Sequence, residues 1–202
     1  MFVRLIFGLG SVVLVIAAGL AAALIFGTAP PPPPLRSISA AGEQIARAAA
    51  DLPRLETFQA RDKTALAYRR YAGNPGHGLA VLIHGSSGSS AEMHLAAKAL
   101  ARSGIGAVAI DVRGHGASGR RGDISYAGQL DDDMTDLVRY LAKQYPGEPR
   151  ILIGHSSGGG YVLHVAASRL ACAFKGYIAL SPYLNYRAPT VRPGNGGWTG
   201  VY

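Results

Sequence analysis

Apolar runs alternate with polar breaks from about residue 55 to residue 187, and this pattern predicts strands alternating with helices. Four segments are too short for helices and rich in β-forming residues, at 79–83, 107–112, 151–153 and 177–180, and they are apolar apart from Asp111. The stretches between them fit helices at 91–103, at 128–145 and after Ser156. Strands that are apolar throughout are buried on both faces, as in a parallel sheet covered by helices on both sides. We therefore expect an α/β fold.

Two local patterns refine this expectation. Residues 55–60 and 64–71 are short strand candidates separated by Arg61-Asp62-Lys63, which predicts a hairpin. In the 128–145 stretch one face is apolar, which is typical of an amphipathic helix, and it carries Leu130, Met134, Leu137, Val138 and Leu141. Because ligands of open α/β sheets bind beyond the carboxyl ends of the strands, we expect the functional residues in the loops at that edge.

The N-terminus carries a different pattern. Residues 5–26 contain no charged residue, and at about 1.5 Å per residue a helix of that length reaches roughly 33 Å, enough to cross a bilayer core. The run predicts a single transmembrane anchor within residues 1–27. A cleaved signal peptide is the alternative, with 21–23 as a small-residue cleavage site. The flanking charges weakly favour an inside N-terminus, which places the domain on the extracytoplasmic side.

A Pro/Ala-rich linker is predicted over residues 28–54. It contains five consecutive prolines at 30–34, which favour an extended polyproline II spacer over a helix. A ligand for a proline-recognition domain is the alternative. The α/β domain then covers residues 55–187, and residues 188–202 form a Pro/Gly-rich tail or the start of a lid.

Composition narrows the possible functions. The net charge is +8, but the basic residues are scattered, and no basic run or nucleic-acid motif occurs. We therefore expect no nucleic-acid partner. The positive charge is expected to lie on a solvated surface, where its only partners would be anionic lipid headgroups. The single cysteine, Cys172, cannot form an internal disulfide, and we expect it to be a small buried hydrophobic residue.

The segment Gly154-His155-Ser156-Ser157-Gly158 is a G-x-S-x-G motif between a predicted strand and a predicted helix. In this context the motif predicts a nucleophile elbow, in which the serine sits on a sharp turn and its Oγ projects above the sheet. Acyl transfer also needs donors for the oxyanion. We expect one from the backbone N–H of Ser157 and the other from Ser86, in the loop after an earlier strand, where Gly85 permits close approach.

Three motifs together resemble the α/β-hydrolase superfamily, in its serine-aminopeptidase-like, monoglyceride-lipase and lysophospholipase-like branch. They are His84-Gly85-Ser86-Ser87-Gly88, the D-x-R-G-H-G-x-S segment 111–118, and 154–159. The resemblance implies an α/β-hydrolase fold that uses no cofactor and no metal. It also implies a small-molecule or lipid ester as substrate.

The resemblance further implies roles for residues around the serine. Asp111 and Arg113 order a strand end and His115 shapes the wall of the site, while His84 and His155 shape the backbone and do not transfer protons. Among the other histidines, we expect His164 to pack in the core and His77 and His94 to lie on the surface. A metal cluster of Asp131, Asp132, Asp133 and Asp136 is a weaker alternative to acidic residues that favour a helix N-terminus.

The C-terminal part departs from the family pattern. In α/β-hydrolases the acid and the histidine of the triad follow the serine, but after Ser156 the sequence has no Asp or Glu and only His164. We expect both partners beyond residue 202, in a membrane-anchored serine hydrolase of acylglycerol-like or lysophospholipid-like esters. The alternative is a non-catalytic binding protein of this fold at the membrane.

Overall fold

The computed structural model describes residues 14–23, 27, 50–122 and 124–184. Residues 14–23 form a helix with exposed side chains, and they belong to a unit separate from the domain. In these described ranges no helix is both long and apolar enough to span a membrane. The predicted anchor over 5–26 extends beyond the described helix at both ends. Most of the predicted linker and the whole tail at 188–202 also lie outside the described residues.

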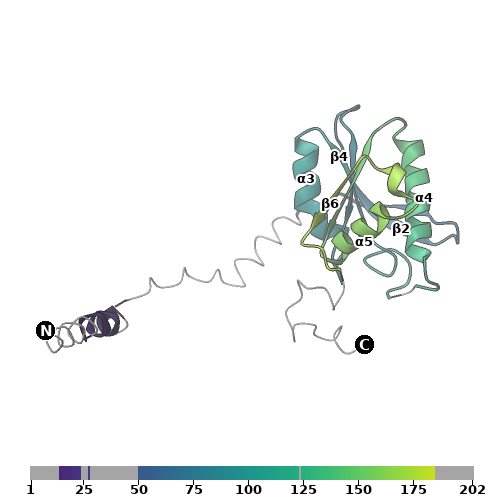
Figure 1. The fold of residues 1–202 in the computed structure, drawn as a ribbon. Coiled ribbons are helices and arrows are strands. Elements are labelled where there is room, and N and C mark those ends of the chain that lie inside the picture. Colours follow the sequence, from purple (N-terminus) through teal and green to yellow (C-terminus); the bar gives the residue numbers. More distant parts are fainter. Residues whose placement is uncertain (1–13, 24–26, 28–49, 123, 185–202) are drawn as a thin grey trace, which may run out of the picture. The chain divides into compact units, whose positions relative to one another are not determined.

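The domain is built on a six-stranded, mostly parallel sheet (Figure 1). Its strands follow the order β1-β2-β4-β3-β5-β6, with β1 at Leu55–Gln59, β2 at Ala65–Tyr71, β3 at Leu79–Ile83, β4 at Gly106–Ile110, β5 at Arg150–His155 and β6 at Gly176–Leu180. The pairs β4–β3, β3–β5 and β5–β6 are parallel. The predicted hairpin is confirmed as the antiparallel pair β1–β2, and β2 also runs antiparallel to β4.

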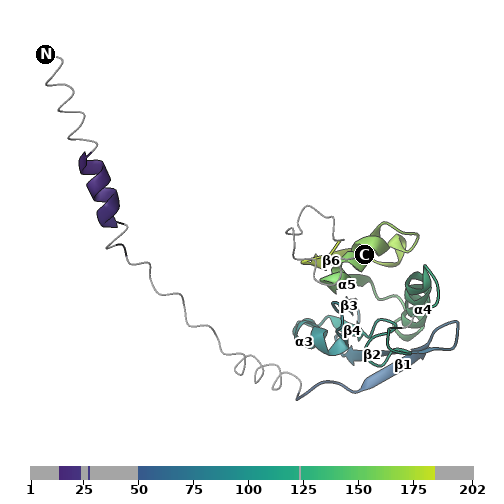
Figure 2. The same ribbon diagram turned by 90° about the horizontal axis from the view of Figure 1, so that it is seen from below.

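Helices cover both faces of the sheet (Figure 2). They are α3 at His94–Arg102, preceded by the 3₁₀ turn η1 at Ser90–Met93, α4 at Gln129–Gln144 and α5 at Ser157–Ala166, with a second 3₁₀ turn, η2, at Ala171–Ala173. One core cluster packs Val81 and Ile83 against α4 and α5. The other packs Ala80 and Leu82 against α3. Because successive residues of β3 enter opposite layers, the strand is apolar throughout, and the predicted α/β fold is confirmed.

One strand boundary and one predicted burial differ from the pattern. The predicted strand at 107–112 ends at Ile110, because the Asp111 carboxylate and Val112 N–H bond to the neighbouring loops. Cys172, predicted to be buried, is exposed. It lies in the short turn η2, which has no buried residue, so the apolar character of its neighbours does not indicate a core position.

Candidate active site

Ser156 lies at the apex of the turn between β5 and α5. Its backbone is in the left-handed region at φ 54° and ψ −118°, which is rarely adopted by a non-glycine residue and costs about 1–3 kcal/mol. Backbone hydrogen bonds hold it there, from the Ser156 N–H to the Leu180 carbonyl (3.0 Å) and from the Tyr183 N–H to the Ser156 carbonyl (2.9 Å). The motif therefore adopts the sharp strand-to-helix turn that the sequence predicts.

The motif glycines make this turn possible. A Cβ on Gly154 would overlap the carbonyl of Gly158. A Cβ on Gly158 would lie 2.6 Å from the Ile83 carbonyl oxygen and still closer to that of His84. Glycine at both positions therefore lets β5, the start of α5 and the end of β3 approach one another closely.

The two predicted oxyanion donors lie beside the serine. Ser157 is the first residue of α5, so its N–H has no acceptor within the helix. The loop after β3 approaches from the other side, since an ideal Cβ on Gly85 would lie 3.3 Å from the Cβ of Ser156. In the described part of the chain the Ser86 N–H has no backbone acceptor. Gly85 therefore lies close to Ser156, and the assignment of the Ser86 and Ser157 N–H groups as oxyanion donors stays a prediction.

His84 orders this loop through both ring nitrogens. Its Nε2 accepts the Val112 N–H (3.1 Å), so Nδ1 carries the proton and donates to the Gly85 carbonyl (2.7 Å). Burial lowers the pKa of His84, against a smaller upward effect of the Gly85 hydrogen bond. A neutral imidazole with both nitrogens occupied is a structural element, not a base.

Asp111 joins three segments at the same edge of the sheet. Its buried carboxylate accepts N–H groups from Ser90 (2.6 Å) and Ala117 (2.8 Å). Its carbonyl accepts the hydroxyl of Ser118 (2.6 Å), whose Oγ in turn accepts the Ala67 N–H (2.8 Å). These bonds fix the end of β4 relative to β2 and η1.

Arg113 ties the loop after β4 to the hairpin and to α4. Its guanidinium is buried and makes two 2.6 Å hydrogen bonds to the Asp133 carboxylate. It also bonds Thr64 (3.0 Å) and Asp62 (3.2 Å). The Asp133 hydrogen bonds raise the pKa of Arg113 despite its burial. Burial alone would raise the pKa of Asp62, but hydrogen bonds from Arg113 and Thr64 outweigh it and lower the pKa to about 2.

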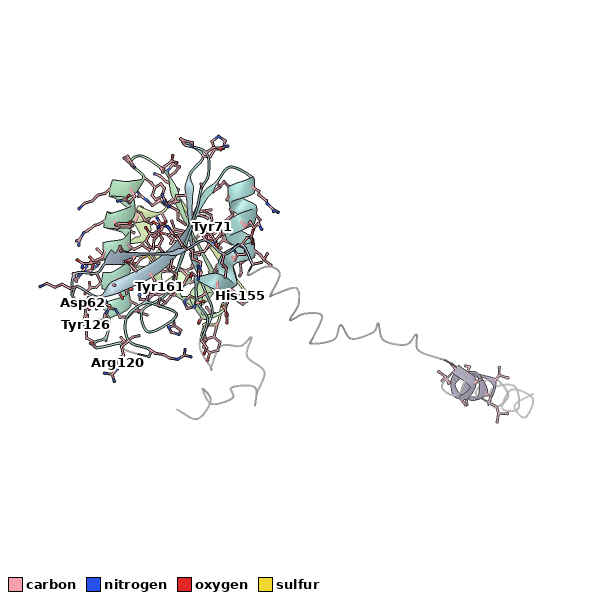
Figure 3. All side chains as sticks on the ribbon, turned by 180° about the vertical axis from the view of Figure 1, so that it is seen from behind. Asp62, Tyr71, Arg120, Tyr126, His155 and Tyr161 are labelled. Atoms are coloured by element: carbon pink, nitrogen blue, oxygen red, sulfur yellow. The ribbon has the colours of Figure 1, made fainter. Side chains whose placement is uncertain are left out.

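His115 and His155 come from different segments and contact the loop that contains His84 and Gly85. The His115 ring packs against that of His84 at 5.3 Å, and its Nδ1 lies 3.2 Å from the Arg113 carbonyl oxygen. His155 is exposed, beside Gly85, and Figure 3 shows it at the end of the domain that carries the loops after the parallel strands. Neither ring bonds the Ser156 hydroxyl in the residues that the structure describes.

Two of the other histidine predictions were wrong. His94 is buried, with Nδ1 2.9 Å from the Tyr71 hydroxyl and Nε2 3.0 Å from Asp51. The side chain of His164 is 56% exposed and lies 2.9 Å from Asp131, because the buried stripe of α5 passes through Val162 and Val165. His77, predicted at the surface, is exposed.

The acidic residues of α4 pair with arginines and with His164. Asp131 and Asp132 occupy the first turn, as predicted. Their partners are His164 for Asp131, Arg61 for Asp132 and Asp136, and Arg113 for Asp133. This arrangement uses the carboxylates in ion pairs between elements.

Glu92 is a residue that sequence reasoning missed. Its carboxylate accepts the Gly85 N–H (3.3 Å) and occupies the space where Gly88 would carry a Cβ. It therefore braces the loop that presents the Ser86 N–H. In the sequence, Glu92 is only a carboxylate a few residues after a Gly- and Ser-rich loop. Many surface glutamates share that position, so the sequence does not predict its contact with the loop.

A large cavity of the described domain lies away from Ser156. It has a volume of about 590 Å³ and is lined by the starts of β3 and β4 and the end of α4, including Tyr71, Leu79, Gly106 and Tyr145. These positions are at the opposite end of the parallel strands from the elbow. The candidate site therefore rests on the geometry of the elbow, not on this cavity.

Comparison with known proteins adds a family match and several relatives. A family model described as serine aminopeptidase, S33, matches residues 74–200. The monoacylglycerol lipase of Mycolicibacterium smegmatis is 36% identical over 91 residues, which cover 45% of this chain and 32% of that lipase. The chain thus spans less than two thirds of the length of this relative.

Solved structures show the same fold. A monoglyceride lipase from Saccharomyces cerevisiae superposes with a TM-score of 0.55 at 23% identity, over 66% of this chain and 45% of that one. A Butyrivibrio proteoclasticus protein solved with bound ferulic acid superposes with a TM-score of 0.56 at 27% identity, over 63% of this chain and 52% of that one.

Proposed function

The chain belongs to the serine aminopeptidase, S33, family of α/β-hydrolases, and from this premise we propose that it is a serine hydrolase of carboxylic esters with Ser156 as its nucleophile. The observation that carries the proposal is the strained backbone of Ser156 at the turn between β5 and α5, with Gly85 in close approach. Strain at such a position persists only where the surrounding structure imposes it, and it clusters at active sites.

The proposed reaction proceeds through an acyl-serine. Ser156 Oγ adds to the ester carbonyl carbon, and the negative charge that develops on the carbonyl oxygen is stabilised by the N–H groups of Ser86 and Ser157. The ester C–O bond then breaks, and the alcohol leaves with the proton that the serine hydroxyl gave up. Water adds to the acyl-serine and releases the acid. The positive end of the α5 dipole favours the oxyanion in both steps.

The proposed substrates are acylglycerol or lysophospholipid-like esters. The support is the similarity to a monoacylglycerol lipase over 91 residues of this chain. No residue of the described site recognises a peptide amine, so we expect hydrolysis of a monoacylglycerol to exceed hydrolysis of an aminoacyl anilide. Measuring both rates on one preparation decides between these substrate classes.

We also propose that residues 5–26 anchor the protein in a membrane, with the domain on the extracytoplasmic side. The support is the uncharged 22-residue run, of which residues 14–23 are helical with exposed apolar side chains. This arrangement would hold the domain close to lipid esters.

A second candidate is a non-catalytic binding protein. The observation that favours it is that no imidazole in the described residues bonds the Ser156 hydroxyl. A serine hydroxyl without an adjacent base is a weak nucleophile. In this case the elbow would bind an acyl group or carboxylate without turnover.

A fluorophosphonate probe distinguishes the two candidates. We expect a protein that includes the acid and histidine predicted beyond residue 202 to be labelled, and the label to be lost in Ser156→Ala, because the probe needs an activated serine beside an oxyanion hole. Ser103→Ala, an exposed serine at the end of α3, serves as the matched control and should keep the label. A wild-type protein that folds normally and still stays unlabelled would favour the binding protein.

A further inference from the structure

We propose that the loop between β4 and α4 docks the domain onto an anionic lipid bilayer, with Arg120, Arg121 and Ile124 as the contacting residues. This inference concerns where the domain binds, and its test requires no catalysis. It therefore stands or falls separately from the proposed hydrolase activity and from the proposed anchor.

Hydrogen bonds fix the conformation of this loop, and its tip, which carries Arg120 and Arg121, is exposed. Four hydrogen bonds order it: Ser118 N–H to His115 carbonyl (2.9 Å), Gly122 N–H to Gly114 carbonyl (2.8 Å), Ser125 N–H to Gln129 Oε1 (2.6 Å) and Tyr126 hydroxyl to Asp132 Oδ2 (2.8 Å). Gly119 also lies against the hairpin, since an ideal Cβ there would be 3.1 Å from Thr64. The exposure of Arg120 and Arg121 follows from this fold of the loop.

The charges around the loop leave its two arginines unneutralised among the described residues. The neighbouring carboxylates already have other partners. Arg113 pairs with Asp62 and Asp133, Arg61 pairs with Asp132 and Asp136, and the ring of His164 lies against Asp131. Within the described ranges no carboxylate forms an ion pair with Arg120 or Arg121. One acidic residue, Asp123, follows them in the sequence, so the tip keeps a net positive charge. A positive tip attracts anionic headgroups.

Large apolar side chains accompany the arginines. Ile124 is 51% exposed and Tyr126 is 45% exposed. A soluble anion would need only the charges, whereas a bilayer interface rewards cations together with an inserted apolar or aromatic side chain. The combination therefore favours a lipid surface as the partner.

The loop also lies where docking would matter. His115, at its start, packs on His84 in the loop beside Ser156. Figure 3 shows Arg120 and Tyr126 at the same end of the domain as His155. Contact through this loop would turn the elbow toward the bilayer.

An environment-sensitive fluorophore on the loop tests the proposal. The dye is attached at Ile124→Cys in the full chain carrying Cys172→Ser, with Leu14→Arg and Ile16→Arg added so that the proposed anchor does not insert. The protein is mixed with vesicles of phosphatidylcholine alone or with phosphatidylglycerol added. We expect a blue shift with the anionic vesicles and little with the neutral ones, and the shift should shrink as salt is raised. A reference dye at Ser103→Cys, at the other end of the domain, should not respond.

Charge variants make the test specific. Each arginine near an anionic surface strengthens binding by about fivefold, so Arg120→Gln with Arg121→Gln should raise the lipid concentration at half-shift by roughly 25-fold. The matched control removes two positive charges elsewhere, with Arg102→Gln and Lys143→Gln at the ends of α3 and α4, and should change it little. The proposal is overturned if the Ile124 dye does not shift, if neutral vesicles shift it equally, or if both double variants weaken binding alike.

Discussion

Gly158 is the residue on which the geometry of the elbow depends most directly. In Gly158→Ala the new Cβ meets the backbone carbonyls of Ile83 and His84, which cannot move without displacing β3. We expect a loss of about 1–3 kcal/mol or more in the free energy of unfolding, as for overpacked cores. Urea unfolding of the variant and the wild type measures it.

The matched control is Gly176→Ala in β6. There the nearest atom to the new Cβ is Ile151 Cγ2 at 3.5 Å, an ordinary contact. Its stability should stay within about 0.5 kcal/mol of the wild type, or rise, because alanine loses less chain entropy in a strand than glycine. Equal losses in both variants would contradict the role assigned to Gly158.

For single residues, the sequence predicts a conformation that neighbouring residues impose by steric constraint. It does not predict burial or contacts that depend on partners far away in the chain. The elbow was predictable because the constraint on Ser156 comes from glycines two residues away. His94 was not, because its partner Asp51 is 43 residues earlier in the chain and the pair forms only in the fold. His164 and Cys172 were misplaced for the opposite reason: apolar neighbours in sequence suggested burial, but neither residue faces the sheet.

Elements were easier to predict than the contacts between them. The strands β3, β5 and β6 lie within a few residues of the predicted runs because each contains a short run of apolar β-forming residues, and β3 is buried along its whole length. Arg113 joins the β1–β2 hairpin, the loop after β4 and helix α4, and no sequence pattern predicts these contacts. Its partners Asp62 and Asp133 come from separate elements, and only the folded chain brings them together.

This junction predicts a dependence of stability on acid. The folded pKa of Asp62, about 2, lies below the ordinary value of 3.8. The ionised carboxylate therefore contributes its full stability above about pH 4 and loses it as the pH falls toward about 2. We expect the free energy of unfolding to decrease over that range, measured by urea unfolding at each pH.

Asp62→Asn should lower the stability at pH 6 and reduce the decrease between about pH 4 and pH 2. Part of the decrease should remain, because hydrogen bonds from Arg61 outweigh burial and lower the pKa of Asp136 as well. Arg113→Gln should reduce the Asp62 contribution in the same way, so the effects of the two variants on the acid dependence should not add. An unchanged acid dependence in Asp62→Asn would show that the pair does not act as described.

For the whole molecule, the apolar N-terminal segment allows a direct test of the proposed membrane anchor. If residues 5–26 span a bilayer, the full chain should remain in membranes after alkaline carbonate extraction. Leu14→Arg with Ile16→Arg should release it, because each arginine near a helix centre costs about 2.5–3.5 kcal/mol in insertion. Fractionation followed by immunoblotting measures the distribution.

The control places the same charges on the domain, with Leu95→Arg and Leu163→Arg at exposed positions, and should leave the protein in the membrane fraction. The mass of the mature chain separates the two predictions for this segment, since an anchor keeps the full 21.0 kDa whereas a signal peptide is removed. Full-length protein that carbonate extracts completely would contradict the anchor. In that case any membrane contact would have to come from the domain itself, and the dye at position 124 would report it.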